Sequence, residues 1–301
     1  MAKVTKAVIP AAGFGTRFLP QTKAMPKEML PLVDKPIIQY IVEGLVEAGI
    51  KDIIIVGNSN KRSVEDHFDV PNEDLINNLR SGGEKKQHYI DEMEQISSLA
   101  NFVYVRQKGP YGTGTPLMNA AHLLGNEPFI YVYTDDLIRA TPNPYKQLID
   151  LYDELGGSII ACVPARNDDD YNRFGIVGGE PVRDGVIRMD NIIEKPGKDR
   201  APSNFAAVGG YVFAPEILNY IESGVQNLEP GKEFYLNEFI MAPMARDGHA
   251  FYGALLRDGV YYDTGDKLGY LKTVFDFALQ HNEVGPELRE YLRSRLNDGQ
   301  L

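Results

Sequence analysis

The chain has 301 residues, of which 43% are apolar and 24% are charged, and its formal net charge is −11. This length can bury a large core, as one big α/β domain or as one domain with a small appendage. The negative charge disfavours nucleic acid and an anionic membrane surface as partners, because both would repel the protein.

The location of the protein follows from three further features. No apolar run approaches the roughly 20 residues that span a bilayer. The N-terminal segment MAKVTK leads directly into a predicted strand, so we expect no secretory signal and a cytoplasmic protein. The single Cys162 cannot form an internal disulfide, and in the apolar run of residues 158–163 it is expected to be a buried, inert thiol.

A glycine-containing loop follows the first predicted strand, residues 7–9. Glycines allow sharp bends that expose backbone N–H groups, and Arg17 and Lys27 add positive charge, so this segment is suited to bind phosphate. The prolines among residues 20–31 are expected to hold the following stretch extended. The loop residues proposed to contact a nucleotide are Ala11, Ala12, Gly13 and Gly15.

A dinucleotide-binding fingerprint is the rival interpretation of this loop, and it would imply an NAD-dependent enzyme. That fingerprint needs a third glycine where this chain has Phe18. The prolines that follow also disfavour a helix that would begin at once and receive a pyrophosphate at its N-terminus. Phosphate binding without a dinucleotide fold is therefore favoured.

Strands and helices alternate along the first half of the chain, which predicts parallel βαβ units. The whole sequence predicts an α/β fold with a mostly parallel, Rossmann-like sheet flanked by helices, a small antiparallel flap and C-terminal helices. We expect one domain over residues 1–301, made of a core, a second part and C-terminal helices at 1–163, 164–266 and 267–301. The last predicted helix, residues 283–296, is available for subunit contact, and a homo-oligomer is expected.

Two carboxylates, Asp135 and Asp136, follow the predicted strand at residues 129–133 after one threonine. Buried carboxylates are costly unless they hold a cation or join a hydrogen-bond network. Oxygen ligands suit Mg²⁺, which binds through one or two carboxylates and keeps other positions for phosphate and water. For one of the two residues, capping of the next turn is the simpler interpretation.

The segment from Gly13 to Pro31, GFGTRFLPQTKAMPKEMLP, resembles the signature of sugar-1-phosphate nucleotidyltransferases. The segment from Lys27 to Glu43, KEMLPLVDKPIIQYIVE, is similar to the branch that joins UTP and glucose 1-phosphate to give UDP-glucose and pyrophosphate. Matching segments recur as far as Leu271, so the resemblance covers nearly the whole chain.

The resemblance implies a role for each matching residue and Mg²⁺ as the cofactor. It also implies that residues 1–163 are a nucleotide-binding core and residues 164–266 a sugar-phosphate-binding part. In this family the first carboxylate after the strand is a metal ligand, which selects Asp135 over Asp136. The implied roles are triphosphate binding by Arg17 and Lys27, nucleobase recognition by Gln107 and Gly112, sugar-phosphate binding by Gly175, Glu194 and Lys195, and metal binding by Asp135 and Asp263. Arg17, Lys27 and Lys195 are the implied catalytic residues.

The chain departs from the uridylyltransferase pattern at residues 113–117, which read Thr-Gly-Thr-Pro-Leu in place of Leu-Gly-His-Ala-Val. A thymidylyltransferase or another sugar-1-phosphate nucleotidyltransferase therefore stays open as an alternative. A catalytically silent sensor of sugar nucleotides is a further alternative of a different class. Both candidate metal ligands and all candidate phosphate-binding bases are present, which argues against the sensor.

Overall fold

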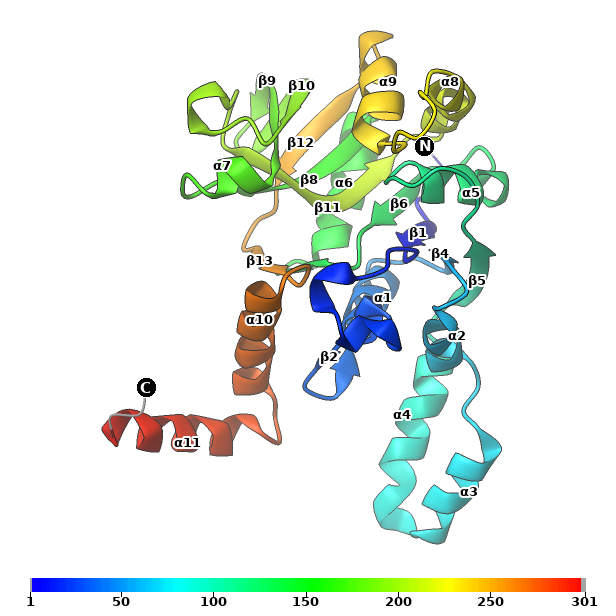
Figure 1. The fold of residues 1–301 in the computed structure, drawn as a ribbon, viewed down its shortest axis with the longest axis vertical. Coiled ribbons are helices and arrows are strands. Elements are labelled where there is room, and N and C mark those ends of the chain that lie inside the picture. The colour runs from blue at the N-terminus through cyan, green and yellow to red at the C-terminus, as the bar shows by residue number, and fades with distance from the viewer. Residues whose placement is uncertain (1, 299–301) are drawn as a thin grey trace.

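A computed structural model describes residues 2–298 and contains a nine-stranded central sheet with helices on both faces (Figure 1). One half of the sheet is parallel, and β1 lies between β4 and β6. The strands of this half, in sheet order, are β5 (Asn101–Arg106), β4 (Asp52–Gly57), β1 (Lys6–Pro10) and β6 (Phe129–Val132). Their carboxyl ends therefore meet at one edge, where ligands bind in open α/β folds.

The other half of the sheet is mostly antiparallel. Its strands, again in sheet order, are β11 (Phe205–Phe213), β8 (Ser158–Pro164), β12 (Phe251–Leu255), β10 (Val186–Glu194) and β9 (Gly175–Arg183). β9 and β10 form the predicted antiparallel flap, and they stand beside β12 in Figure 1.

The prediction of a mostly parallel sheet is wrong, because the sheet is mixed. Four strand pairings are parallel and five are antiparallel. The predicted flap is not a separate appendage, since its strands continue the main sheet through β11 and β12. β12 was not predicted at all, and it enters the sheet between β8 and β10.

Helices cover both faces of the sheet and extend beyond it. The helices are α1 (Ile37–Glu47), α2 (Arg62–Phe68), α3 (Glu73–Ser81), α4 (Gln87–Ser97), α5 (Thr115–Leu124), α6 (Pro144–Leu155), α7 (Asp170–Arg173), α8 (Ile221–Gln226), α9 (Ala242–Arg246), α10 (Lys267–Gln280) and α11 (Gly285–Asn297). α3 and α4 project from the body as one excursion, while α10 and α11 form a separate C-terminal extension (Figure 1). Within residues 2–298, no helix is both long and apolar enough to cross a membrane.

The core lies in two layers, one on each face of the sheet. Along β1 the side chains alternate, so that Ala7 and Ile9 pack in one layer and Val8 packs in the other. The first layer is completed by apolar residues of α1 and α6, and the second by residues of α5 such as Leu117. Cys162 is buried in the second layer, as predicted, and burial raises the pKa of its thiol.

Two short antiparallel pairings lie outside the main sheet. β2 (Pro31–Leu32) pairs with β3 (Lys35–Pro36) directly before α1. β7 (Asp136–Arg139) pairs antiparallel with β13 (Val260–Asp263), so that Asp136 lies opposite Asp263. This second pairing brings the two predicted metal-binding segments together.

The division of the chain into parts at residues 1–163, 164–266 and 267–301 stays a prediction.

Candidate active site

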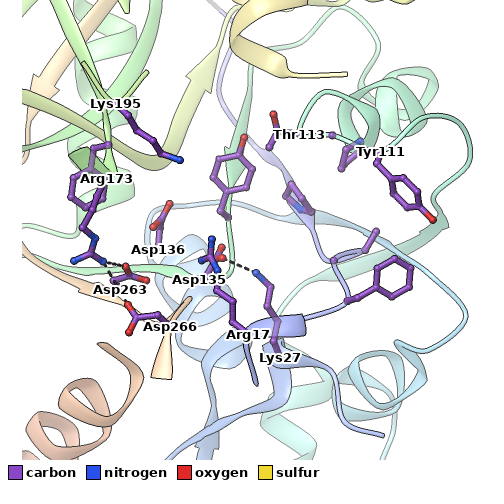
Figure 2. A pocket seen from close by; sticks show the side chains of 18 of the residues that line it. Arg17, Lys27, Tyr111, Thr113, Asp135, Asp136, Arg173, Lys195, Asp263 and Asp266 are labelled. Carbon is purple, nitrogen blue, oxygen red and sulfur yellow. Dashed lines mark hydrogen bonds and ion pairs between the residues drawn. The ribbon is translucent and has the colours of Figure 1, made fainter. Parts of the chain in front are cut away.

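A cleft of about 820 Å³ opens at the carboxyl ends of β1, β5 and β6 and reaches the flap (Figure 2). Nine of the predicted site residues line it, namely Ala12, Gly13, Arg17, Lys27, Gln107, Gly112, Asp135, Lys195 and Asp263. The other four, Ala11, Gly15, Gly175 and Glu194, are not part of its lining. Segments as far apart in sequence as the first loop and the β13–α10 corner thus share one cavity.

The glycine loop, residues 11–17, leaves β1 and turns along one side of the cleft. Ala11 is buried and donates its backbone N–H to the carbonyl of Val56 at 2.8 Å, which continues the sheet pairing by one residue. Gly15 has a φ of +64°, and an added Cβ would lie 3.1 Å from side-chain atoms of both Lys27 and Thr22. A larger residue would therefore strain the backbone and crowd the neighbouring turn.

The stretch after the glycine loop is not extended as predicted. It forms three short 3₁₀ turns at Thr16–Phe18, Gln21–Lys23 and Lys27–Met29. The prolines begin or separate these turns because their fixed φ also suits a turn. Phe18 packs in the core, and no helix of eight or more residues follows directly, so the dinucleotide alternative finds no support.

Lys27 and Asp135 form an ion pair of 2.7 Å at the centre of the cleft (Figure 2). Burial by itself would lower the pKa of Lys27, but the carboxylates of Asp135 and Glu28 raise it above its ordinary value. Burial would likewise raise the pKa of Asp135, and the Lys27 ammonium more than offsets this and lowers it. Both members of the pair therefore carry charge at neutral pH.

Asp136 lies beside this pair and accepts a hydrogen bond of 2.5 Å from the hydroxyl of Tyr261. Burial, together with the negative charge of Asp135, raises the pKa of Asp136 to about 7. The two adjacent carboxylates thus differ. Asp135 is charged at neutral pH because Lys27 lowers its pKa, whereas the pKa of Asp136 lies close to neutral pH. This difference agrees with the choice of Asp135 as the candidate ligand.

Asp263 is paired with Arg173, which sequence reasoning did not assign (Figure 2). Arg173 also lies 3.6 Å from Asp266, whose carboxylate caps α10 by accepting the backbone N–H of Leu268. The only sequence signal for Arg173 was its position directly before the Phe174–Gly175 pair. Its contact with Asp263 spans 90 residues and depends on the tertiary fold.

The space between Asp135 and Asp263 fits a hard cation such as Mg²⁺. A Cβ added at Gly265 would lie 3.1 Å from an oxygen of Asp263 and 3.2 Å from an oxygen of Asp135, so the glycine leaves a gap that both carboxylates flank. Within residues 2–298 no group of three or more His, Cys, Asp or Glu side chains is arranged to hold a metal. A two-carboxylate site suits Mg²⁺, which takes its remaining oxygens from substrate phosphate and water.

The loop at residues 109–114 lies across the cleft from the flap. Gly112 has a φ of +126°, and an added Cβ would lie only 2.4 Å from the backbone of Phe234. Close packing against Phe234 therefore requires glycine at this position, and the predicted nucleobase contact of Gly112 stays a prediction. The hydroxyl of Thr113 accepts the backbone N–H of Leu236 at 3.0 Å, so the departure from the family pattern anchors the loop.

Two aromatic side chains of the cleft were missed in the sequence. Phe14 and Tyr111 are 55% and 65% exposed, and their rings meet edge to face with centroids 6.2 Å apart. Both line the cleft, and Tyr111 stands on the side opposite Lys195 (Figure 2). Exposed aromatic rings at a cavity mouth suit a flat ligand group.

The flap contributes Lys195, which lines the cleft, while Glu194 and Gly175 lie opposite each other in the β9–β10 ladder. Lys195 has a φ of +47°, uncommon for a residue other than glycine, and its ammonium lies 3.6 Å from the Glu194 carboxylate. The predicted sugar contacts of Glu194 and Gly175 stay predictions.

The glycine loop at a sheet edge, the cationic side chains and the paired aspartates together define a nucleotidyltransferase. The sequence matches the Nucleotidyl transferase family over residues 6–278, and the chain belongs to that family. It is 42% identical over 301 residues to the UTP–glucose-1-phosphate uridylyltransferase of Bacillus subtilis strain 168, covering 100% of both chains.

Solved structures agree with this family assignment. A UTP-bound UDP-glucose pyrophosphorylase from Acinetobacter baumannii is 34% identical with a TM-score of 0.85, and the match covers 96% of this chain and 98% of that one. A UDP-glucose pyrophosphorylase in complex with UDP-glucose is 35% identical with a TM-score of 0.78, covering 92% and 100%.

Proposed function

We propose that this protein transfers the uridylyl group of UTP to glucose 1-phosphate, giving UDP-glucose and pyrophosphate. The observation that carries the proposal is the convergence of Lys27, Asp135, Asp263 and Lys195 on one cleft. The full-length similarity to uridylyltransferases supports the choice of substrates.

The triphosphate is held on the side of the glycine loop. The loop offers backbone N–H groups, and Arg17 and Lys27 supply positive charge to an otherwise acidic protein. The guanidinium of Arg17 donates to the carbonyl of Gly265 at 3.3 Å, which orients it beside the aspartates. Tyr111 and Gln107 line the nucleobase end.

The reaction is an in-line displacement at phosphorus. A phosphate oxygen of glucose 1-phosphate forms a bond to the α-phosphorus of UTP, and the bond from that phosphorus to the oxygen bridging the β-phosphorus breaks. The electron pair leaves with pyrophosphate. Because the attacking phosphate is already anionic at neutral pH, no general base is needed, and positioning and electrostatics supply the catalysis.

The two substrates are both anionic, so the chain must bring like charges together. Lys195 binds the phosphate of the sugar, and Glu194 and Gly175 face the sugar from the flap. Mg²⁺ held by Asp135 and Asp263 would neutralise negative charge on the phosphates as they approach. Arg173, which pairs with Asp263, is a further cation available to phosphate.

A panel of UTP, dTTP, CTP and ATP with glucose 1-phosphate, followed by pyrophosphate release, tests the proposal. Turnover with UTP at least tenfold above the others is the expected result. A preference for dTTP would instead identify a thymidylyltransferase, and binding of UDP-glucose without turnover would identify a sensor. A cytoplasmic location and a homo-oligomer remain predictions.

A further inference from the structure

The turn that follows β4, residues 58–61, lies behind the glycine loop: it contacts the loop, but its residues are not among those that line the cleft. The side-chain amide of Asn58 donates to the carbonyl of Ala12 at 2.7 Å. The ammonium of Lys61 donates to the carbonyl of Gly13, also at 2.7 Å. Two side chains from one turn thus bind two consecutive carbonyls of the loop.

Lys61 is also one member of a buried ion pair. Its ammonium lies 2.7 Å from the carboxylate of Glu28, and the two residues are only 4% and 1% exposed. Burial lowers the pKa of Lys61, and the attraction of Glu28 opposes this. Glu28 directly follows Lys27 in the same 3₁₀ turn. One buried lysine therefore connects the glycine loop to the turn that carries Lys27.

The direction of these carbonyls matters for anion binding. In a trans peptide the C=O of one residue and the N–H of the next point in opposite directions. Because Asn58 and Lys61 hold the carbonyls of Ala12 and Gly13 on the rear side, the N–H groups of Gly13 and Phe14 are directed to the other side. Both of these residues line the cleft.

We propose that Asn58 and Lys61 are positioning residues that hold the glycine loop with its N–H groups toward the triphosphate and its carbonyls away from it. This inference rests on the proposed function, because it assigns the loop to the triphosphate. A loop free to turn would present carbonyl oxygens to phosphate oxygens, and their repulsion would weaken binding. Glu28 serves the same purpose by retaining Lys61 in the buried position.

The test measures UTP binding by calorimetry together with thermal unfolding. Lys61→Met alone leaves a buried unpaired carboxylate and is expected to unfold easily. The double variant Glu28→Gln/Lys61→Met removes both charges, so the net charge of the protein is unchanged and folding is expected to persist. We expect its dissociation constant for UTP to rise about tenfold, while its KM for glucose 1-phosphate changes less than twofold.

Asn58→Ala provides an independent arm, because it leaves the ion pair in place. Loss of one hydrogen bond to Ala12 should weaken UTP binding about fivefold with little change in melting temperature. Lys51→Met and Asn60→Ala are matched controls, since both side chains are exposed and neither is among the side chains that donate a hydrogen bond to the loop within residues 2–298. Their affinity for UTP should stay within twofold of the wild type.

The outcomes separate the two proposals. Normal UTP affinity in Asn58→Ala, or in a folded Glu28→Gln/Lys61→Met, would overturn the positioning role even if the melting temperature falls. No UTP binding by the wild type would overturn the proposed function and this inference together. Weaker UTP binding by both variants, with the sugar-phosphate KM preserved, would support the inference.

Discussion

The two sides of the cleft differ in how firmly their charged groups are held. The nucleotide half, defined as residues 11–17, Lys27, residues 107–113 and Asp135, contains an ion pair whose side chains are 20% and 32% exposed. In the sugar half, defined as Gly175, Glu194 and Lys195, the corresponding ion pair is 3.6 Å long and its side chains are 63% and 59% exposed. Exposed ion pairs contribute about 0–1 kcal/mol to the free energy of unfolding, whereas removing one partner of a buried ion pair lowers that free energy far more.

This difference indicates that the ion pair of the nucleotide half contributes to the stability of the fold, while the exposed pair of the sugar half contributes little. Changes in the nucleotide half should therefore affect both stability and turnover. Changes in the sugar half should affect substrate binding alone.

The largest effect is expected for Asp135→Asn. This change removes a candidate metal ligand and the carboxylate that holds Lys27, so kcat should fall about a thousandfold while the protein still folds. Pyrophosphate release and circular dichroism measure the two outcomes. Asp150→Asn, on the exposed face of α6, is the matched control. Near-normal Mg²⁺-dependent turnover would remove Asp135 from the mechanism.

Lys27→Met tests whether the ion pair of the nucleotide half stabilises the fold. Turnover should fall about a hundredfold, and the free energy of unfolding should drop by about 1–2 kcal/mol because Asp135 loses its partner. Urea unfolding and initial rates check the two values. Lys23→Met removes an exposed lysine outside the cleft and should alter neither. An unchanged free energy of unfolding in Lys27→Met would contradict the claim that the ion pair of the nucleotide half stabilises the fold.

Lys195→Met makes the corresponding change in the sugar half. We expect the KM for glucose 1-phosphate to rise about tenfold, because one charge-assisted contact to phosphate is lost. The free energy of unfolding should change by less than about 0.5 kcal/mol, since the side chain is exposed. Lys198→Met, three residues away and also exposed, is the control. A stability loss equal to that of Lys27→Met would show that the halves do not differ.

Tyr111→Ala tests the nucleobase end of the nucleotide half. Loss of one stacking surface should raise the KM for UTP about fivefold and leave the KM for glucose 1-phosphate unchanged. Tyr89→Ala, an exposed tyrosine of α4, controls for loss of a surface aromatic ring. An equal effect on both substrates would argue against a nucleobase contact.

The smallest effect is expected from the titration of Asp136. The pKa of this group rises from 3.8 in the unfolded chain to about 7 in the folded protein, so the folded state binds more protons between these values. The stability contributed by Asp136 is therefore present at low pH and is lost as the pH rises toward 7.

Asp136→Asn does not titrate and can still accept the hydrogen bond from Tyr261. At pH 8 the variant should be more stable than the wild type by about 1 kcal/mol, and this gain should shrink at pH 5. Thermal unfolding at both pH values measures the difference. A gain that does not depend on pH would show that Asp136 is not the titrating group.

Several features of the protein follow from its sequence alone. Local signals mark the start of helix α6, because Asn143 caps it and Pro144 occupies its first turn. Strands β1 and β6 were likewise predicted, at residues 7–9 and 129–133, since short apolar runs with glycine or proline boundaries are local signals. Ala12, Gly13, Gln107 and Asp135 line the cleft for the same reason, since they lie within three residues of the ends of β1, β5 and β6.

Only the tertiary structure decided the remaining features. The place of β12 between β8 and β10 cannot be predicted from its five residues, because strand order depends on packing rather than on local pattern. Arg173 meets Asp263 across 90 residues, and Lys61 reaches Gly13 across 48. The need for glycine at position 112 comes from the backbone of Phe234. Such contacts depend on which distant segments the folded core brings together, and no local pattern of residues encodes that choice.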